Sequence, residues 1–277
     1  MRSAREKPAA VVDASAATHE PYSAFTVRVL VTNDDGVDSP ELLALAQALE
    51  SVATVDVVAP SLNQSGVSRS FSLEPALAVD EVRLADGRSA FSVSGTPVDC
   101  VRFGVLGLTG ARPDVVCAGI NRGPNLGDDV HYSGTVAAAL EAHFLGTPGI
   151  AFSQLAGSDG SYDVEAICAA AVRLVAIAPA LDVVLNVNGP ALPAGQVRGL
   201  RVARLGRRIY ELALSQQGAD APDGRRHFRL YDTIPTHHAD DGTDFSAIED
   251  GCISVTPLAV TGTNHDAADR VRELVER

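Results

Sequence analysis

Short apolar runs alternate with amphipathic segments along most of the chain. The first run, Val27–Thr32, is rich in β-branched residues and predicts a strand, and Glu41–Leu49 has apolar residues at helical spacing. The same alternation predicts strands over 54–60, 89–93, 113–120, 149–153 and 183–187, and helices over 97–104, 133–145 and 163–179. Strands that alternate with helices are typical of an α/β fold, a doubly wound, mostly parallel sheet.

The alternation weakens after about residue 190. Strand-like pieces such as Gly199–Arg204 are followed by a polar stretch over Ser215–Arg226, and a helix is predicted over His265–Glu276. Residues 1–24 carry charges throughout and lack the apolar segment of a signal peptide. We therefore predict three parts: a disordered tail (1–24), an α/β core (25–190) and a β-rich C-terminal extension (191–277).

The composition argues against several functional classes. A formal net charge of −13 disfavours binding to duplex nucleic acid, and no apolar run is long enough to span a bilayer. Lys7 is the only lysine, which excludes a Gly-Lys phosphate loop and Schiff-base chemistry. The four cysteines form no CxxC pair, so we expect free thiols in a reducing compartment and hence a cytoplasmic protein.

An acidic turn, Asn33–Pro40, connects the first predicted strand with the first predicted helix. It contains the adjacent carboxylates of Asp34 and Asp35, at the end of a strand where open α/β sheets bind their ligands. Adjacent carboxylates repel each other, and a divalent cation would remove that repulsion. The turn is therefore a candidate metal site, although taken alone it could equally be a plain turn before a helix start at Ser39-Pro40.

Three more predicted loops follow strands and are rich in oxygen donors: Asn63–Gly66, Ser94–Pro97 and Gly119–Gly127. In a parallel sheet they gather at the same edge as the acidic turn. Their hydroxyl and amide oxygens, with the two carboxylates, suit Mg²⁺ or Mn²⁺ better than zinc or copper. By itself Asn63–Gly66 is more simply an ordinary loop, whereas the glycines and proline of Gly119–Gly127 indicate close approach to a ligand.

The predicted helix over 133–145 begins with Ser133, Gly134 and Thr135. Backbone N–H groups and the helix dipole favour an anion such as phosphate at this position, even if Ser133 or Thr135 also caps the helix. A side chain at Gly134 would intrude on that anion. We therefore expect Gly134→Val to harm catalysis while leaving a metal site built on the other loops occupied.

Other polar residues are weaker candidates. His131 could act as a general acid, and Arg122 could face a phosphate. The pair His237-His238 could bind a ligand. More simply, His131 is a histidine in a loop, Arg122 lies beside a surface carboxylate, and His237-His238 belong to a polar loop.

Together, these segments resemble the SurE (survival protein E) family of metal-dependent nucleotidases. The segments that carry the resemblance are Val29–Gly36 (VLVTNDDG), Val58–Gly66 (VAPSLNQSG), Ser94–Cys100 (SGTPVDC), Pro113–Leu140, and Gly242–Asp244 with Ser254–Leu258. The long block within Pro113–Leu140, GINRGPNLGDDVHYSGTVAAAL, is the most specific of them. The resemblance extends over about Val27–Leu258 and is poor over Tyr210–Asp241.

The resemblance implies a Rossmann-like fold with a C-terminal extension that assembles a homodimer or homotetramer. It implies hydrolysis of nucleoside 5′- and 3′-monophosphates with one divalent cation per subunit, Mg²⁺ or Mn²⁺. The metal ligands that it implies are Asp34, Asp35, Ser65 and Asn121, of which the two aspartates are the catalytic residues. The phosphate-binding residues that it implies are Asn125, Ser133, Gly134 and Thr135.

The alternative is a non-catalytic nucleotide-binding module on a Rossmann-like fold. Such a module would keep the phosphate loop but would not need the paired aspartates. The first turn contains no GxGxxG, which disfavours a dinucleotide module. A covalent aspartyl-phosphate route is also disfavoured, because it would call for a DxD arrangement and Gly36 follows Asp34-Asp35 instead.

Overall fold

The computed structural model describes residues 27–73, 76–181, 183–211, 213–216, 225–230 and 235–260. The predicted N-terminal tail, residues 1–24, and the helix predicted over 265–276 lie outside the described residues.

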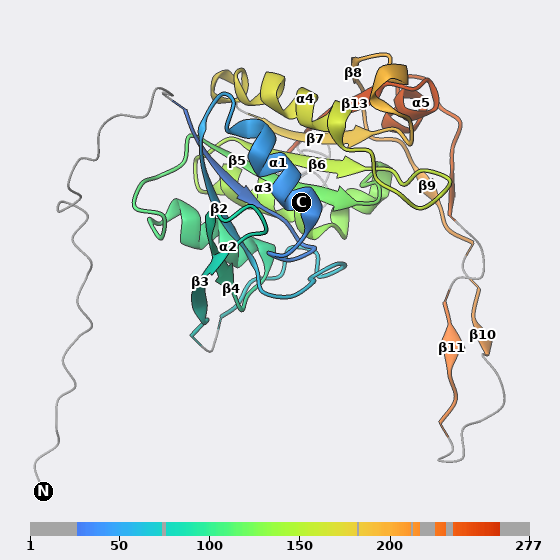
Figure 1. The fold of residues 1–277 in the computed structure, drawn as a ribbon. Coiled ribbons are helices and arrows are strands. Elements are labelled where there is room, and N and C mark those ends of the chain that lie inside the picture. Colours follow the sequence, from blue (N-terminus) through green and yellow to red (C-terminus); the bar gives the residue numbers. More distant parts are fainter. Residues whose placement is uncertain are drawn as a thin grey trace, which may run out of the picture.

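Within the described residues, nine strands form one central sheet, in the spatial order β3-β4-β2-β1-β5-β6-β7-β13-β8 (Figure 1). Their bounds are β1 (Arg28–Thr32), β2 (Thr54–Pro60), β3 (Val79–Arg83), β4 (Ser89–Val93), β5 (Val115–Arg122), β6 (Gly149–Gln154), β7 (Val184–Gly189), β8 (Leu200–Val202) and β13 (Ile253–Leu258). Six neighbouring strands of this order, β4-β2-β1-β5-β6-β7, are mutually parallel. β3 runs antiparallel to its neighbour β4, and β13 runs antiparallel to its neighbour β7.

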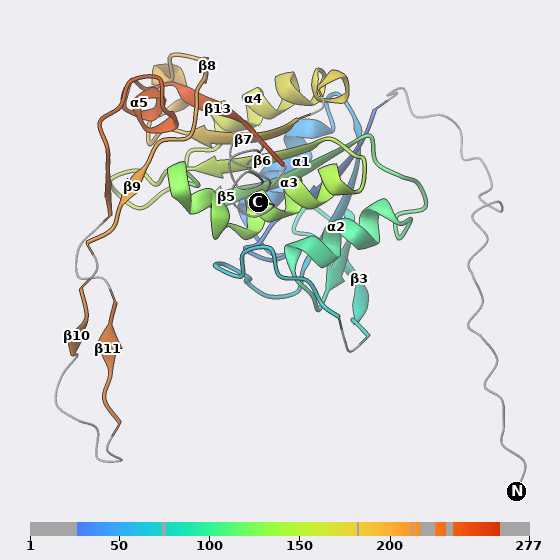
Figure 2. The same ribbon diagram turned by 180° about the vertical axis from the view of Figure 1, so that it is seen from behind.

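Helices cover both faces of this sheet. The longer ones are α1 (Pro40–Leu49), α2 (Pro97–Val105), α3 (Gly134–Phe144) and α4 (Glu165–Val175). α1 and α4 pack on one face of the sheet, and α2 and α3 pack on the other. Figure 2 shows this arrangement from behind. Successive residues of a strand point to opposite faces. Val29 and Val31 of β1 therefore join the α1–α4 core, and Leu30 joins the α2–α3 core.

The doubly wound, mostly parallel sheet predicted from the sequence is confirmed. Thr96 caps α2 and Pro97 occupies its first turn, because a fixed proline φ suits a helix start. The helix predicted over 163–179 is shorter: α4 ends at Val175, and a 3₁₀ turn, Ala178–Ala180, follows. None of the described helices is long and apolar enough to cross a membrane.

The part beyond residue 190 supplies β8, β13 and the short helix α5 (Asp244–Glu249). It also forms two small antiparallel pairs, β9 (Arg208–Ile209) with β12 (Thr236–His237) and β10 (Ser215–Gln216) with β11 (Phe228–Arg229). The β10–β11 pair lies apart from the sheet in both views (Figures 1 and 2). β8 and β13 belong to the central sheet, so the sheet itself extends across residue 190. The division into a core (25–190) and a C-terminal extension (191–277) stays a prediction.

Candidate active site

The acidic turn after β1 is closed by the side chain of Asn33. Its Nδ2 donates to the carbonyl oxygen of Gly36 at 2.9 Å, and its Oδ1 accepts from the backbone N–H of Gly36 at 3.2 Å. Gly36 has a φ of +106°, a left-handed conformation that favours glycine. The intervening residues, Asp34 and Asp35, are thereby held at the carboxyl end of β1.

Asp34 is 3% exposed and is enclosed by the start of α3. The hydroxyl of Thr135 donates to its Oδ1 at 2.5 Å. Burial raises the pKa of Asp34, the Thr135 hydrogen bond opposes that rise, and the charge of Asp35 adds to it. A buried carboxylate beside a second carboxylate is stabilised by a nearby positive charge.

Asp35 connects the acidic turn to two neighbouring loops. Its Oδ1 accepts from Asn63 Nδ2 at 3.2 Å, and its Oδ2 accepts from the backbone N–H of Arg122 at 3.3 Å. Asn63 Oδ1 in turn accepts from the backbone N–H of Ser65 at 2.9 Å. Burial raises the pKa of Asp35, and the contacts with Arg122 lower it. The Asn63–Gly66 loop is therefore positioned by Asp35, one of the two carboxylates that we predict to bind the metal.

Asn121 lies where β5 becomes irregular. The register between β5 and β6 shifts between Ala118 and Asn121. Within this shift Gly119 has a φ of +134°, and a Cβ there would lie 2.3 Å from the carbonyl oxygen of Phe152, so only glycine fits. Asn121 Nδ2 donates to the carbonyl oxygen of Gly123 at 2.8 Å. Its Oδ1 is therefore the side-chain atom suited to a cation.

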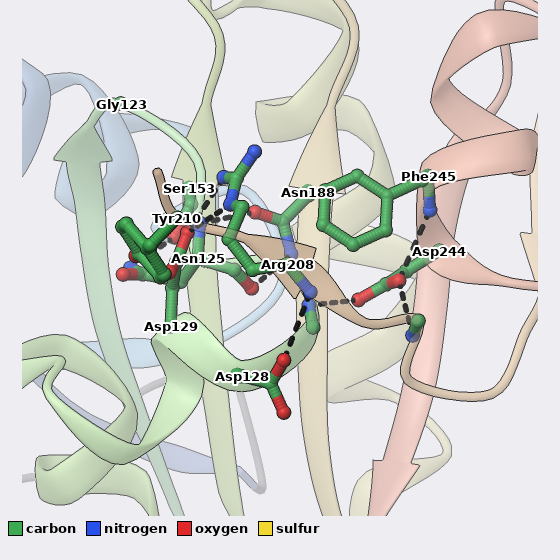
Figure 3. Close-up of polar contacts among 12 residues, drawn as sticks. Gly123, Asn125, Asp128, Asp129, Ser153, Asn188, Arg208, Tyr210, Asp244 and Phe245 are labelled. Carbon is green, nitrogen blue, oxygen red and sulfur yellow. Dashed lines mark hydrogen bonds and ion pairs between the residues drawn. The ribbon is translucent and has the colours of Figure 1, made fainter. Parts of the chain in front are cut away.

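Asn125 is held by polar side chains of β6 and β7 (Figure 3). Its Nδ2 donates to Ser153 Oγ at 2.8 Å, and its backbone N–H donates to Asn188 Oδ1 at 2.8 Å. Its carbonyl oxygen accepts from Asn186 Nδ2 at 2.8 Å. Buried amides are costly unless they are hydrogen-bonded. These asparagines therefore form a network that fixes Asn125.

The start of α3 contacts Asp34 more closely than the sequence predicted. Ser133 is the N-cap, and its Oγ accepts from the backbone N–H of Val136 at 3.1 Å. A Cβ on Gly134 would lie 2.9 Å from Asp34 Cβ and 3.1 Å from Asp34 Oδ2. The expectation that Gly134→Val would spare the metal site assumed that the site is built on other loops, whereas the new side chain would meet Asp34, a predicted ligand.

Five of the predicted site residues line one pocket of about 260 Å³: Asp34, Ser65, Asn121, Asn125 and Ser133. Asp35 lines a second pocket, of about 310 Å³, and Arg122 lines both. Gly134 and Thr135 do not line either pocket and contact Asp34 instead. The structure thus brings the predicted residues together around Asp34, with Thr135 bonded to a carboxylate rather than lining the pocket.

The donor set around Asp34 is rich in oxygen. No group of three or more His, Cys, Asp or Glu side chains in the described part of the chain is arranged to hold a metal. The ligands predicted for a cation here are the carboxylates of Asp34 and Asp35 and the neutral oxygens of Ser65 and Asn121. Such a set fits a hard divalent cation and does not fit zinc or copper.

Sequence reasoning missed several residues that line the 260 Å³ pocket, among them Asp129, Tyr132 and Tyr210. Asp129 belongs to the 3₁₀ segment Gly127–His131. Its carboxylate accepts from the Tyr210 hydroxyl and pairs with Arg208 Nη2 at 2.6 Å (Figure 3). Tyr210 and Arg208 are distant from Asp129 along the chain, so no local pattern indicates this contact.

Asp244 joins the same region to the C-terminal part of the chain (Figure 3). Its side chain is buried and accepts from the backbone N–H groups of Gly127 and Gly206, each at 2.8 Å. The Gly242–Asp244 segment was among those that carried the family resemblance, which is the signal that could have identified this residue.

The weaker candidates have mainly structural contacts. His131 is exposed and does not line either pocket. Arg122 pairs with Glu41 at 2.8 Å in addition to lining both pockets. His237 stacks on Phe245, with ring centroids 4.2 Å apart, and pairs with Glu249.

Comparison with known proteins decides the family. The family model described as Survival protein SurE matches residues 29–212. The chain belongs to the SurE family. The 5′-nucleotidase SurE of Rubrobacter xylanophilus is 46% identical over 244 residues, which cover 84% of this chain and 91% of that protein. The 5′-nucleotidase SurE of Herpetosiphon aurantiacus is 44% identical over 249 residues, which cover 88% of this chain and 97% of that protein.

A solved SurE structure shares the fold. The crystal structure of the SurE protein from Aquifex aeolicus matches with a TM-score of 0.75 at 35% identity, over 89% of this chain and 99% of that one. The predicted family and the predicted α/β fold are thereby confirmed. The roles of the individual SurE-type site residues stay predictions.

Proposed function

We propose that this chain is a 5′-nucleotidase, a phosphomonoesterase that hydrolyses nucleoside 5′-monophosphates, and also 3′-monophosphates, to nucleoside and phosphate. The observation that carries the proposal is Asp34 in a pocket with the hydroxyl and amide side chains of Ser65, Ser133, Asn121 and Asn125. Asp35, the next residue, lines the second pocket. Its relatives at 41% to 46% identity are named 5′-nucleotidases, which supports the same activity for this chain.

The proposal includes one divalent cation per subunit, Mg²⁺ or Mn²⁺. The residues that would hold it are Asp34, Asp35, Ser65 and Asn121. The oxygen donors in this set, and the repulsion between the buried Asp34 carboxylate and the partly buried Asp35 carboxylate, fit such an ion. When bound, the cation would supply positive charge and Lewis acidity to the phosphoryl group.

The residues of the chain itself position the reactants. The start of α3 offers backbone N–H groups to the phosphate, and Asn125 lies in the same pocket, held by its network. Thr135 fixes the Asp34 carboxylate, which we assign to orienting the attacking water. In-line attack at phosphorus depends mainly on such positioning and on charge neutralisation.

We further propose a homodimer or homotetramer that acts in the cytoplasm. The β10–β11 pair stands apart from the sheet, and exposed apolar side chains lie in it and next to it: Phe228 in β11, and Leu214 and Leu230 beside the two strands. Exposed apolar groups on a projecting strand pair suit burial against a second subunit. The four cysteines are free and buried, which supports a reducing compartment.

A phosphate-release assay tests the proposed activity. The purified protein is incubated with AMP, GMP, CMP, UMP and 3′-AMP, in Mn²⁺, in Mg²⁺ and in EDTA. We expect phosphate release with metal and none in EDTA, and activity that returns when Mn²⁺ replaces EDTA. Binding of the nucleotides without any release under all metal conditions would instead identify a non-catalytic binding module.

A further inference from the structure

Two tyrosines are among the residues that line the 260 Å³ pocket, although the proposed phosphate chemistry uses only its polar side chains. Tyr132 and Tyr210 line the pocket together with Asp34, Asn121 and Ser133. The exposed fractions are 65% for Tyr132 and 36% for Tyr210, so both rings present surface to a ligand. No step proposed so far employs either ring.

The ring of Tyr210 is held in place by neighbouring groups (Figure 3). Its hydroxyl donates to the Asp129 carboxylate. Arg208 Nη2 forms an ion pair with the same carboxylate at 2.6 Å. The Arg208 guanidinium lies over the Phe245 ring, 4.8 Å from its centroid. A side chain fixed in this way loses little conformational entropy when a ligand binds.

The size of the pocket indicates a ligand larger than a phosphate. A volume of about 260 Å³ is just below the range for small-molecule sites, roughly 300–1,000 Å³, and the second pocket, which shares Arg122, adds about 310 Å³. The polar residues account for the phosphate end. The tyrosines therefore offer an apolar surface to whatever the phosphate is attached to.

We propose that Tyr210 and Tyr132 bind the base of a nucleoside monophosphate by aromatic stacking. This inference rests on the proposed function and names the residues that favour nucleotides over phosphomonoesters without a base. It assigns a residue of the C-terminal extension, Tyr210, to the substrate site, in addition to the extension's proposed role in assembly.

The same contacts predict a tolerance of different bases. The Tyr210 hydroxyl donates to one Asp129 oxygen, and Arg208 contacts the other. These polar groups are thus engaged with each other, and the ring face carries the contact with the base. Stacking is tolerant of sequence because every base has an aromatic face.

The test compares AMP with ribose 5-phosphate, which is AMP without its base. Stacking is worth roughly 5- to 150-fold in affinity, so Tyr210→Ala should raise the KM for AMP by about tenfold. The KM for ribose 5-phosphate should stay within about twofold of wild type, because its contacts are those of the phosphate and sugar alone. Tyr210→Phe keeps the ring and should resemble wild type with AMP.

Tyr132→Ala provides a second variant, since its exposed ring can be removed with less risk to folding than Tyr210. It should also raise the KM for AMP selectively. Phe144→Ala is the control: Phe144 is 53% exposed, lies at the far end of α3 and does not line the pocket. It should leave both substrates unaffected.

Equal changes with AMP and ribose 5-phosphate, or a changed oligomeric state of Tyr210→Ala by light scattering, would assign the tyrosines a structural role and overturn the inference. If wild-type protein hydrolyses neither compound, the proposed function fails separately. Calorimetric binding of AMP and of inorganic phosphate then decides: weaker AMP binding by Tyr210→Ala with unchanged phosphate binding supports base stacking, and unchanged AMP binding refutes it.

Discussion

Replacing Gly134 by alanine is a sharp test of how α3 and the acidic turn depend on each other. Gly134 is the first residue of α3, and its backbone does not need a left-handed φ. Helix propensity alone favours alanine over glycine by about 0.5–1 kcal/mol. The contact with Asp34 predicts the opposite outcome.

The magnitude follows from the distances. The new Cβ would lie 2.9 Å from Asp34 Cβ and 3.3 Å from Pro97 Cγ, whereas non-bonded carbons prefer about 3.5–4.0 Å. Either Asp34 or the first turn of α3 must move. Overpacking of this kind costs about 1–3 kcal/mol, and if that cost is expressed in metal binding the affinity falls roughly 5- to 150-fold.

Mn²⁺ affinity of the Gly134→Ala protein is measured by calorimetry and by metal titration of AMP hydrolysis, with thermal denaturation in parallel. Gly195→Ala is the matched control, because no atom lies within 4 Å of a Cβ at Gly195 and the substitution meets open space. We expect weaker Mn²⁺ binding and lower turnover for Gly134→Ala only. Mn²⁺ affinity within twofold of wild type, with normal turnover, would refute the argument that Gly134 is required by Asp34.

Three further outcomes are expected. Asp35→Asn removes a charged ligand and should lower turnover about a hundredfold or more; near-normal phosphate release at saturating Mn²⁺ would contradict the assignment. Thr135→Val removes the hydrogen bond that lowers the pKa of Asp34, so that pKa should rise further. Mn²⁺ binding by this variant should then weaken at a higher pH than in wild type as the solution is acidified, and coincident pH profiles would count against it. Light scattering should give a dimer or tetramer, and a fully active monomer at micromolar concentration would exclude the proposed assembly.

Much of the α/β core could be predicted from the sequence because its signals are local. Val29, Leu30 and Val31 are all buried, as expected for a strand covered on both faces, and Thr96-Pro97 starts α2 through its own side chains. The order of loops after the strands also predicted which polar residues would gather near Asp34. The family match and the fold comparison confirm the family and the sheet, while the residue roles await the experiments above.

Two strands outside the parallel part of the sheet, β3 and β13, were harder to predict. β3 is a half-exposed strand, so it lacks the continuous apolar run of the buried strands. β13 inserts antiparallel beside β7 after the α/β alternation has ended. Its place depends on pairing with a strand about 70 residues earlier (Ser254 with Asn188), which no local period encodes.

Tertiary structure alone decided how the side chains of the site meet. The sequence by itself determined that Asp34 and Asp35 follow β1 and that Ser133 starts a helix. It did not determine that Thr135 donates to Asp34, that Gly134 is pressed against the same carboxylate, or that Tyr210 reaches Asp129. Such contacts join residues roughly 80 to 100 positions apart. They depend on strand register and helix packing, whereas propensity and periodicity report only on near neighbours in the chain.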